Sequence, residues 1–139
     1  MKIILDKGSI YVIRFDQGEE VIETIKKICF EKNMEAGFFF GLGAARELVL
    51  SHYDIDRKQY NDTPINEDLE IAGIFGNVTR KDGEVYIHAH GSFSDKNFKT
   101  YAGHVKKVIV SGTCEIVLEM LHEPILREHD SKSGLNLLK

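Results

Sequence analysis

Three of the six histidines, His88, His90 and His104, fall within seventeen residues of one another. Residues two apart on a strand project from the same face, so His88 and His90 point together if their segment is extended. A hairpin centred on Asn97 would place His104 opposite His90, because directly paired residues of an antiparallel ladder share a face. Three neutral imidazoles with one open position form the donor set of a zinc site that can take water or a ligand. The spacing therefore predicts a divalent-metal site, with zinc as the first candidate and nickel or copper as alternatives.

The same histidines have a plainer interpretation. A slip of one residue in the hairpin register would turn His104 to the opposite face. In the plainer interpretation, His88 and His90 are polar residues of an edge strand and His104 caps a turn. The predicted metal site thus depends on the register of this hairpin.

Acidic residues that could work beside a metal are few. Glu115 and Glu119 lie four residues apart and share a face if their strand is regular. Such a pair could serve in acid–base catalysis, or could face solvent beside Lys106 and Lys107. Glu115 is the best candidate for a general base. No complete catalytic set is visible, so enzymatic activity is left open.

Two other motifs favour structural roles. Gly41 and Gly43 follow a predicted strand, but Arg46 stands where a dinucleotide-binding loop has its third glycine, and a strand follows in place of a helix. These glycines are expected to permit a tight turn or a close approach between strands. The cysteines, Cys29 and Cys114, lie far apart among apolar neighbours and are expected to be buried and reduced.

The elements that must position these residues are one helix and a series of strands. Apolar residues at three- and four-residue steps predict a helix over Glu19–Lys32, with Asn33 as a left-handed stop. The remaining apolar pattern is typical of strands, with a bend at Ser111-Gly112 and a second short helical turn near Asn97–Ala102. This predicts an α+β fold in which one main helix packs on a mixed, mostly antiparallel sheet. The predicted strands are Lys2–Asp6, Ile10–Phe15, Ala36–Leu42, Glu47–Asp54, Glu70–Thr79, Glu84–Phe93 and Val105–Leu121.

Length and charge narrow the class of protein further. The chain has 139 residues, 42% of them hydrophobic, which fits a single domain over residues 1–139. Its 22 acidic residues exceed its 18 basic ones, which gives no support for strong autonomous binding to duplex DNA. Only three consecutive apolar residues precede Asp6, so neither a signal peptide nor a membrane span is predicted. We expect a cytoplasmic protein with no membrane partner.

Several landmarks occur together along the chain. Gly41-Leu42-Gly43-Ala44 follows the predicted helix, and Ser51-His52-Tyr53-Asp54 comes next. His88-Ala89-His90-Gly91 is then followed by Ala102-Gly103-His104. Together they resemble the plants-and-prokaryotes-conserved (PPC) domain, which plant AT-hook nuclear proteins carry beside their DNA-binding hooks. The resemblance covers nearly the entire chain, and the H-x-H with a later Gly-His is its most specific part.

The resemblance implies an α/β sandwich-like fold that assembles as a homotrimer, with His88, His90 and His104 as a metal site. It also places Arg127 in the C-terminal strand pattern of the family. Stand-alone prokaryotic members carry a DNA-binding label, but this chain has no Arg-Gly-Arg-Pro hook. In the segment that matches the plant partner-recruiting sequence, only Glu70-Ile71 is kept.

Three functions follow as hypotheses. The first is a trimeric protein that holds a divalent metal and binds a small anionic or carbonyl ligand at its open position. The second is a DNA-associated protein in which a trimer gathers lysines into a basic patch. The third is a structural or partner-binding trimer whose metal only stabilises the fold. The lysines of the second hypothesis are Lys96, Lys99, Lys106 and Lys107.

Overall fold

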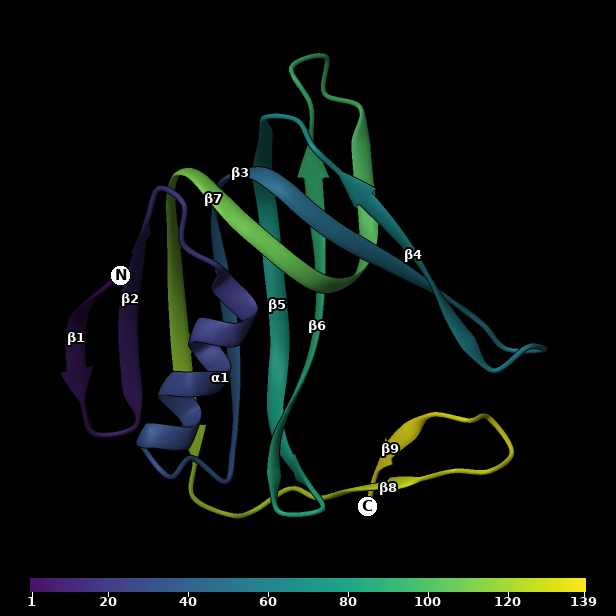
Figure 1. Cartoon of the computed structure of the whole chain (residues 1–139). Helices are drawn as coiled ribbons and strands as arrows, with labels where there is room; N and C mark the ends of the chain where they lie inside the picture. The colour runs from purple at the N-terminus through teal and green to yellow at the C-terminus, as the bar shows by residue number, and fades with distance from the viewer.

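The computed structural model describes all 139 residues, and these form nine strands and one helix joined by turns and loops. Figure 1 shows how the elements are arranged. The helix α1 spans Val21–Glu31 and is the only helix in the fold. No helix has the length and hydropathy needed to cross a membrane. The strands are β1 (Lys2–Lys7), β2 (Ile10–Asp16), β3 (Ala36–Asp54), β4 (Gln59–Ile65), β5 (Leu69–Lys81), β6 (Glu84–Ser94), β7 (Thr100–Leu121), β8 (Arg127–His129) and β9 (Asn136–Leu138).

Seven strands form one sheet in the order β1-β2-β7-β6-β5-β3-β4, with a further pairing of β7 to β3. All pairings between strands are antiparallel, and the only parallel contact is an isolated bridge between Arg80 and Leu126. The predicted single domain with one helix and a mostly antiparallel sheet is confirmed. Because strands dominate so strongly, the fold is mainly β, and the α+β class holds only in that broad sense.

The helix begins and ends where local chemistry directs it. The Glu20 carboxylate caps the N-terminus by accepting hydrogen bonds from the backbone N–H groups of Ile22 and Glu23, at 3.1 and 2.5 Å. It also accepts one from the N–H of Val108 at 3.0 Å, which ties the start of the helix to β7. Asn33 has φ 51° and confirms the predicted left-handed stop.

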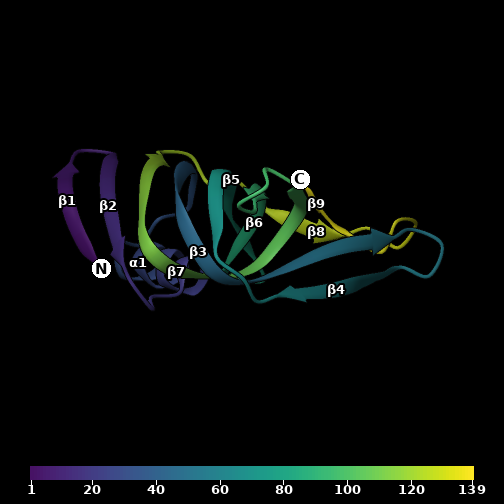
Figure 2. The same cartoon turned by 90° about the horizontal axis from the view of Figure 1, so that it is seen from above.

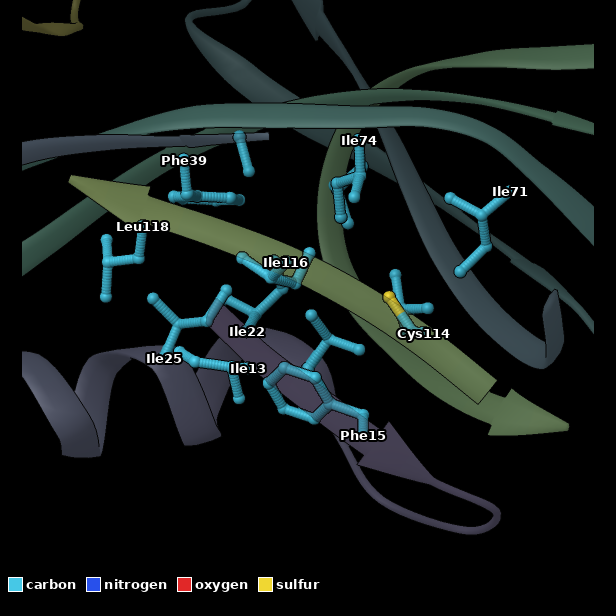
Figure 3. Close-up of a cluster of buried hydrophobic side chains, with 14 of the residues drawn as sticks. Ile13, Phe15, Ile22, Ile25, Phe39, Ile71, Ile74, Cys114, Ile116 and Leu118 are labelled. Carbon is cyan, nitrogen blue, oxygen red and sulfur yellow. The ribbon is translucent and has the colours of Figure 1, made fainter. Parts of the chain in front are cut away.

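The core lies between α1 and one face of the sheet (Figures 1 and 2). The helix packs on β7 and β6, and its Ile22 and Ile25 meet Ile13 of β2 and Ile116 of β7 (Figure 3). Both cysteines are buried and free, as predicted. Strand alternation sends every second side chain to the opposite face, which we call the outer face. The functional features described below all lie on that outer face or at its edge.

Three elements differ from the sequence expectations. The predicted strands 36–42 and 47–54 are one continuous strand, β3. It pairs with β7 along most of its length, with β5 along its first part and with β4 along its second. Gly41 and Gly43 lie within this strand, where a side chain at either would meet the backbone of β7, so the expected close approach is confirmed. The strand β4 was not predicted, and it extends with β3 as an arm beyond the body of the protein (Figures 1 and 2).

Two irregular segments were predicted in and before the long strand β7, and only one of them is confirmed. The predicted helical turn at 97–102 is wrong, because a tight turn occupies this segment and β7 begins at Thr100. The predicted bend at Ser111-Gly112 is confirmed. Gly43 pairs with Cys114 and Ala45 with Val110, so β7 holds two extra residues there and the register shifts.

Candidate metal centre

The three predicted histidines converge on the outer face of β6 and β7. His90 pairs directly with His104 across the hairpin, which confirms the register predicted from a turn centred on Asn97. The ring centroids of His88, His90 and His104 lie 5.1–5.5 Å apart. One nitrogen from each ring falls within 4.8 Å of the others. The structure therefore brings together three imidazoles at a spacing that a single metal ion could bridge.

The turn between β6 and β7 sets this register. The Asp95 carboxylate accepts hydrogen bonds from the backbone N–H groups of Asn97 and Lys99, at 2.8 and 3.0 Å. The Asp95 carbonyl also accepts from the N–H of Phe98, and Phe98 takes φ 61°. These bonds close the turn so that Ser94 pairs with Thr100 and the ladder continues to the histidines. A local aspartate turn thus decides which face His104 occupies.

Burial keeps the cluster in the form that a metal requires. Desolvation, followed by the nearby histidines and Lys106, lowers the pKa of His104 to about 4. Desolvation and the charges of His90 and Arg127 also lower the pKa of His88. Both imidazoles are therefore neutral at pH 7, and neutral imidazole is the metal-binding form.

An unpartnered atom in the cluster tests the fit of a metal further. Nδ1 of His104 is buried and has no hydrogen-bond partner. Buried polar atoms without a partner are uncommon in folded proteins, and each needs an explanation. An imidazole set in which one nitrogen lacks a partner suits a borderline divalent cation such as zinc. The residues present therefore fit a three-histidine metal site.

A polar network supports His104 from the arm. Ser51 of β3 pairs with His104 across the sheet, and its hydroxyl donates to Asp62 of β4 at 2.6 Å. Lys106 forms an ion pair with Asp62 at 2.7 Å, and hydrogen bonds from Lys106 and Ser51 lower the pKa of this carboxyl. The ring of Tyr60 lies 4.9 Å from that of His104. Neither β4 nor these contacts carried a signal in the sequence.

The cluster opens into a cavity of about 330 Å³ between the sheet, the arm and the C-terminal hairpin β8–β9. The hydroxyl of Tyr53 donates to the carbonyl of Ser133, and Lys58 donates to that of Ser131, so the arm and the hairpin are tied together. Arg127 of β8 lies in the cavity wall. The other lining residues are Ser51, His52, Tyr53, Tyr60, Tyr86, His88, His90, Gly103, His104, Leu135, Asn136 and Leu137.

Other candidate residues are not brought to this site. Glu115 lies on the outer face beside Arg14 and Leu42 and does not line the cavity. The expectation that it acts as a general base beside the histidines is therefore wrong. No carboxylate lines the cavity. Lys106 pairs with Asp62 and Lys107 with Glu47, so two lysines of the predicted basic patch are already bound to carboxylates.

The lowered pKa of His104 predicts an acid-sensitive metal-free protein. The unfolded chain takes up this proton near the ordinary histidine pKa of 6.5, whereas the folded chain resists it until about pH 4. Between these values the unfolded state binds more protons, so stability falls as the pH falls through this window. Because the ring is only half-buried, solvent screening leaves an expected loss on the order of 1–2 kcal/mol.

Urea unfolding of chelator-treated protein at pH 7.0 and at pH 4.5 measures this loss, because most of the range between the two pKa values lies between these conditions. A His104→Gln variant is the reference, because it retains every carboxylate and lacks the histidine titration. We expect the wild type to lose more stability than the variant between the two pH values. Equal losses would contradict the burial of a neutral His104.

Comparison with known proteins places the chain in a family. The sequence model of the Plants and Prokaryotes Conserved domain matches residues 4–122. The chain therefore belongs to this family, as its histidine and glycine landmarks indicated. No curated protein matches it at a significant level.

Three solved structures illustrate the likeness. A "putative DNA-binding protein" from Bacteroides thetaiotaomicron is 29% identical with a TM-score of 0.94, over 97% of this chain and 94% of that one. A plant- and prokaryote-conserved protein from Pyrococcus horikoshii is 31% identical with a TM-score of 0.87, over 95% and 92%. A protein described as metal-containing, from Archaeoglobus fulgidus, is 30% identical with a TM-score of 0.85, over 99% and 98%.

Proposed function

We propose that this protein binds one divalent metal ion, zinc in the first instance, and a small ligand in the adjoining cavity. The observation that carries the proposal is the convergence of nitrogens from His88, His90 and His104 within 4.8 Å. The unpartnered Nδ1 of His104 and the metal-containing description of the Archaeoglobus protein also support it. Three protein ligands leave a further coordination position, which faces water or a ligand in catalytic and ligand-binding zinc sites.

A metal held there would supply Lewis acidity toward a carbonyl or anionic group. The chain's own residues would hold the ion through three imidazoles and surround the ligand with tyrosine rings and Arg127. Because no carboxylate lines the cavity, we propose binding of a ligand and assign no reaction.

Elemental analysis tests this proposal directly. Two samples of tag-free protein are compared: one purified without chelator, and one to which zinc is added before dialysis removes the excess. Both should contain about one divalent metal per chain, as expected for a three-histidine site. Absence of metal from both samples would contradict the proposal. The histidines would then be structural polar residues, and the partner-binding hypothesis would lead.

We further propose that the protein assembles as a homotrimer through the outer face. Phe38, Phe40, Leu42 and Phe75 are 40–58% exposed there and lie on neighbouring strands, with Phe40 directly paired to Phe75. We call these four residues the apolar stripe. Large contiguous apolar patches on soluble proteins commonly mark interaction sites. The number of three copies comes from the family resemblance.

The stripe also touches the metal centre. Phe38, Phe40 and Phe75 line a shallow groove together with His88 and His90. A second copy seated on the stripe would therefore cover one side of the histidine cluster. Assembly and ligand access are expected to be coupled at this boundary.

DNA association is the second candidate function, and the description of the Bacteroides protein favours it. Since Lys106 and Lys107 are paired with carboxylates, Lys96 and Lys99 of the β6–β7 turn are the candidates for phosphate contacts. Two such contacts per chain predict that log affinity falls with log salt with a slope of roughly −2 per chain at most. Fluorescence anisotropy of a labelled duplex across a salt series measures this slope. A slope near −4 per chain that flattens in a Lys106→Gln/Lys107→Gln variant would show that the paired lysines also contact DNA.

A further inference from the structure

Arg127 carries a positive charge that the protein itself does not neutralise. The side chain is partly buried in the cavity wall, and none of the ion pairs in the structure involves it. The adjacent carboxylate, Glu128, pairs with Lys139 instead, at 2.9 Å. Desolvation lowers the pKa of Arg127, and no carboxylate acts against this effect. Partly buried charges normally have a counter-charge, because removing an ion from water is costly.

The guanidinium is nonetheless held firmly in place. Nε donates to the hydroxyl of Thr79 at 2.9 Å, and one terminal nitrogen donates to the side-chain oxygen of Asn77 at 2.9 Å. The other terminal nitrogen donates to the carbonyl of Asn136 at 2.6 Å. The group also lies over the ring of Tyr86, with 5.0 Å from Cζ to the ring centroid. Four residues from three strands, β5, β6 and β9, therefore fix its orientation before any ligand arrives.

These contacts leave capacity for one more partner. All three acceptors are neutral, and a guanidinium has five N–H groups, so two N–H groups have no protein acceptor. Tyr60 and Tyr86 also line this cavity, and the ring of Tyr86 lies against the guanidinium. An orientated cation with free donors, set among aromatic rings, is the arrangement that recognises an anion with a short apolar body.

We propose that Arg127 is the anion-recognition residue of this cavity and that the ligand is a small monocarboxylate. One guanidinium balances one negative charge, and the tyrosine and leucine side chains of the wall suit an aliphatic body. Arg127 and Asn136 both belong to the C-terminal hairpin β8–β9, so this hairpin would supply the selectivity. The inference rests on the proposed ligand-binding function of the same cavity.

Calorimetric titration with butyrate and butyramide tests the inference, because the two probes have the same shape and differ in charge. Both are titrated into the full-length protein, once zinc-loaded and once metal-free, and inorganic phosphate forms a third arm. We expect the wild type to bind butyrate at least tenfold more tightly than butyramide or phosphate in both metal states, the ratio expected of a charge-assisted hydrogen bond. Equal affinity for butyrate and butyramide, or preference for phosphate, would overturn the inference without any variant.

Variants then assign the preference to the side chain. Arg127→Gln should remove the preference for butyrate, and Arg127→Lys should retain part of it. The control Arg57→Gln removes an exposed arginine of the arm and should leave the preference unchanged. Thermal melts confirm that each variant is folded. A preference that survives in folded Arg127→Gln would overturn the role of Arg127. If zinc is not taken up but metal-free protein still selects butyrate through Arg127, the proposed metal fails while this inference stands.

Discussion

Replacing His88 and His90 together by alanine is expected to abolish stoichiometric metal binding. The double variant leaves His104 as the only imidazole of the cluster, and one neutral nitrogen cannot supply the coordination that a zinc ion needs. Structural zinc sites contribute many kcal/mol through their full ligand set, so we expect the affinity to fall by about a thousandfold or more. Elemental analysis of the purified variant after zinc addition and dialysis measures the loss.

The matched control is His52→Ala. His52 lines the same cavity but stands outside the histidine cluster, so this variant should keep the wild-type metal content. Metal retained at one per chain in the double variant would show that other residues hold it. Loss in both variants would point to a disturbed cavity.

The same variant separates a structural metal from a ligand-binding one. A metal that binds only the folded state raises the melting temperature according to its concentration relative to its dissociation constant. If the ion serves only the fold, the double variant should melt at a lower temperature while any ligand affinity stays unchanged. If the ion takes part in ligand binding, the affinity for the ligand should fall as well.

Placing a charge in the apolar stripe is expected to dissociate the proposed trimer. Phe40 lies at the centre of the stripe, 54% exposed in the single chain and directly paired with Phe75. A carboxylate buried there between copies would lack a partner, which is strongly unfavourable at an interface. We therefore expect Phe40→Asp to weaken association at least a hundredfold and to yield the 15.8 kDa single chain, whereas the wild type shows three times that mass.

Light scattering coupled to size-exclusion chromatography gives the two masses. Phe30→Asp is the control, because Phe30 is 65% exposed on α1, which packs against the opposite face of the sheet. It should leave the assembly intact. A wild type that is monomeric at all concentrations, or a Phe40→Asp variant that still assembles, would contradict the proposal.

Much of the local structure could be predicted from the sequence. The helix follows from apolar residues at helical spacing, and Asn33 ends it because asparagine tolerates the left-handed conformation. The histidine cluster follows from two spacings, since His88 and His90 are two residues apart and His90 and His104 are equidistant from Asn97. A tight hairpin turns such sequence symmetry directly into spatial pairing.

The sequence was less informative wherever residues far apart had to meet. β4 contains few apolar residues, so no periodicity marked it, yet it carries Tyr60 and Asp62 to His104. Glu115 and Glu119 share one face, as their spacing suggested, but the order of the strands places Glu115 away from the cavity.

The features that could be predicted from the sequence differ from those that the tertiary structure decided in how far apart the interacting residues lie in the chain. The helix α1, its stop at Asn33 and the register of the β6–β7 hairpin arise from interactions among residues close in the chain, which the sequence by itself determined. The cavity depends on Arg127 meeting Asn77 and Thr79, about fifty residues earlier, and on the arm meeting the C-terminal hairpin. These contacts form only when the whole sheet is assembled, because loop closure over such separations has no local signal. The tertiary structure alone decided that the three histidines open onto an aromatic cavity with an unpaired arginine.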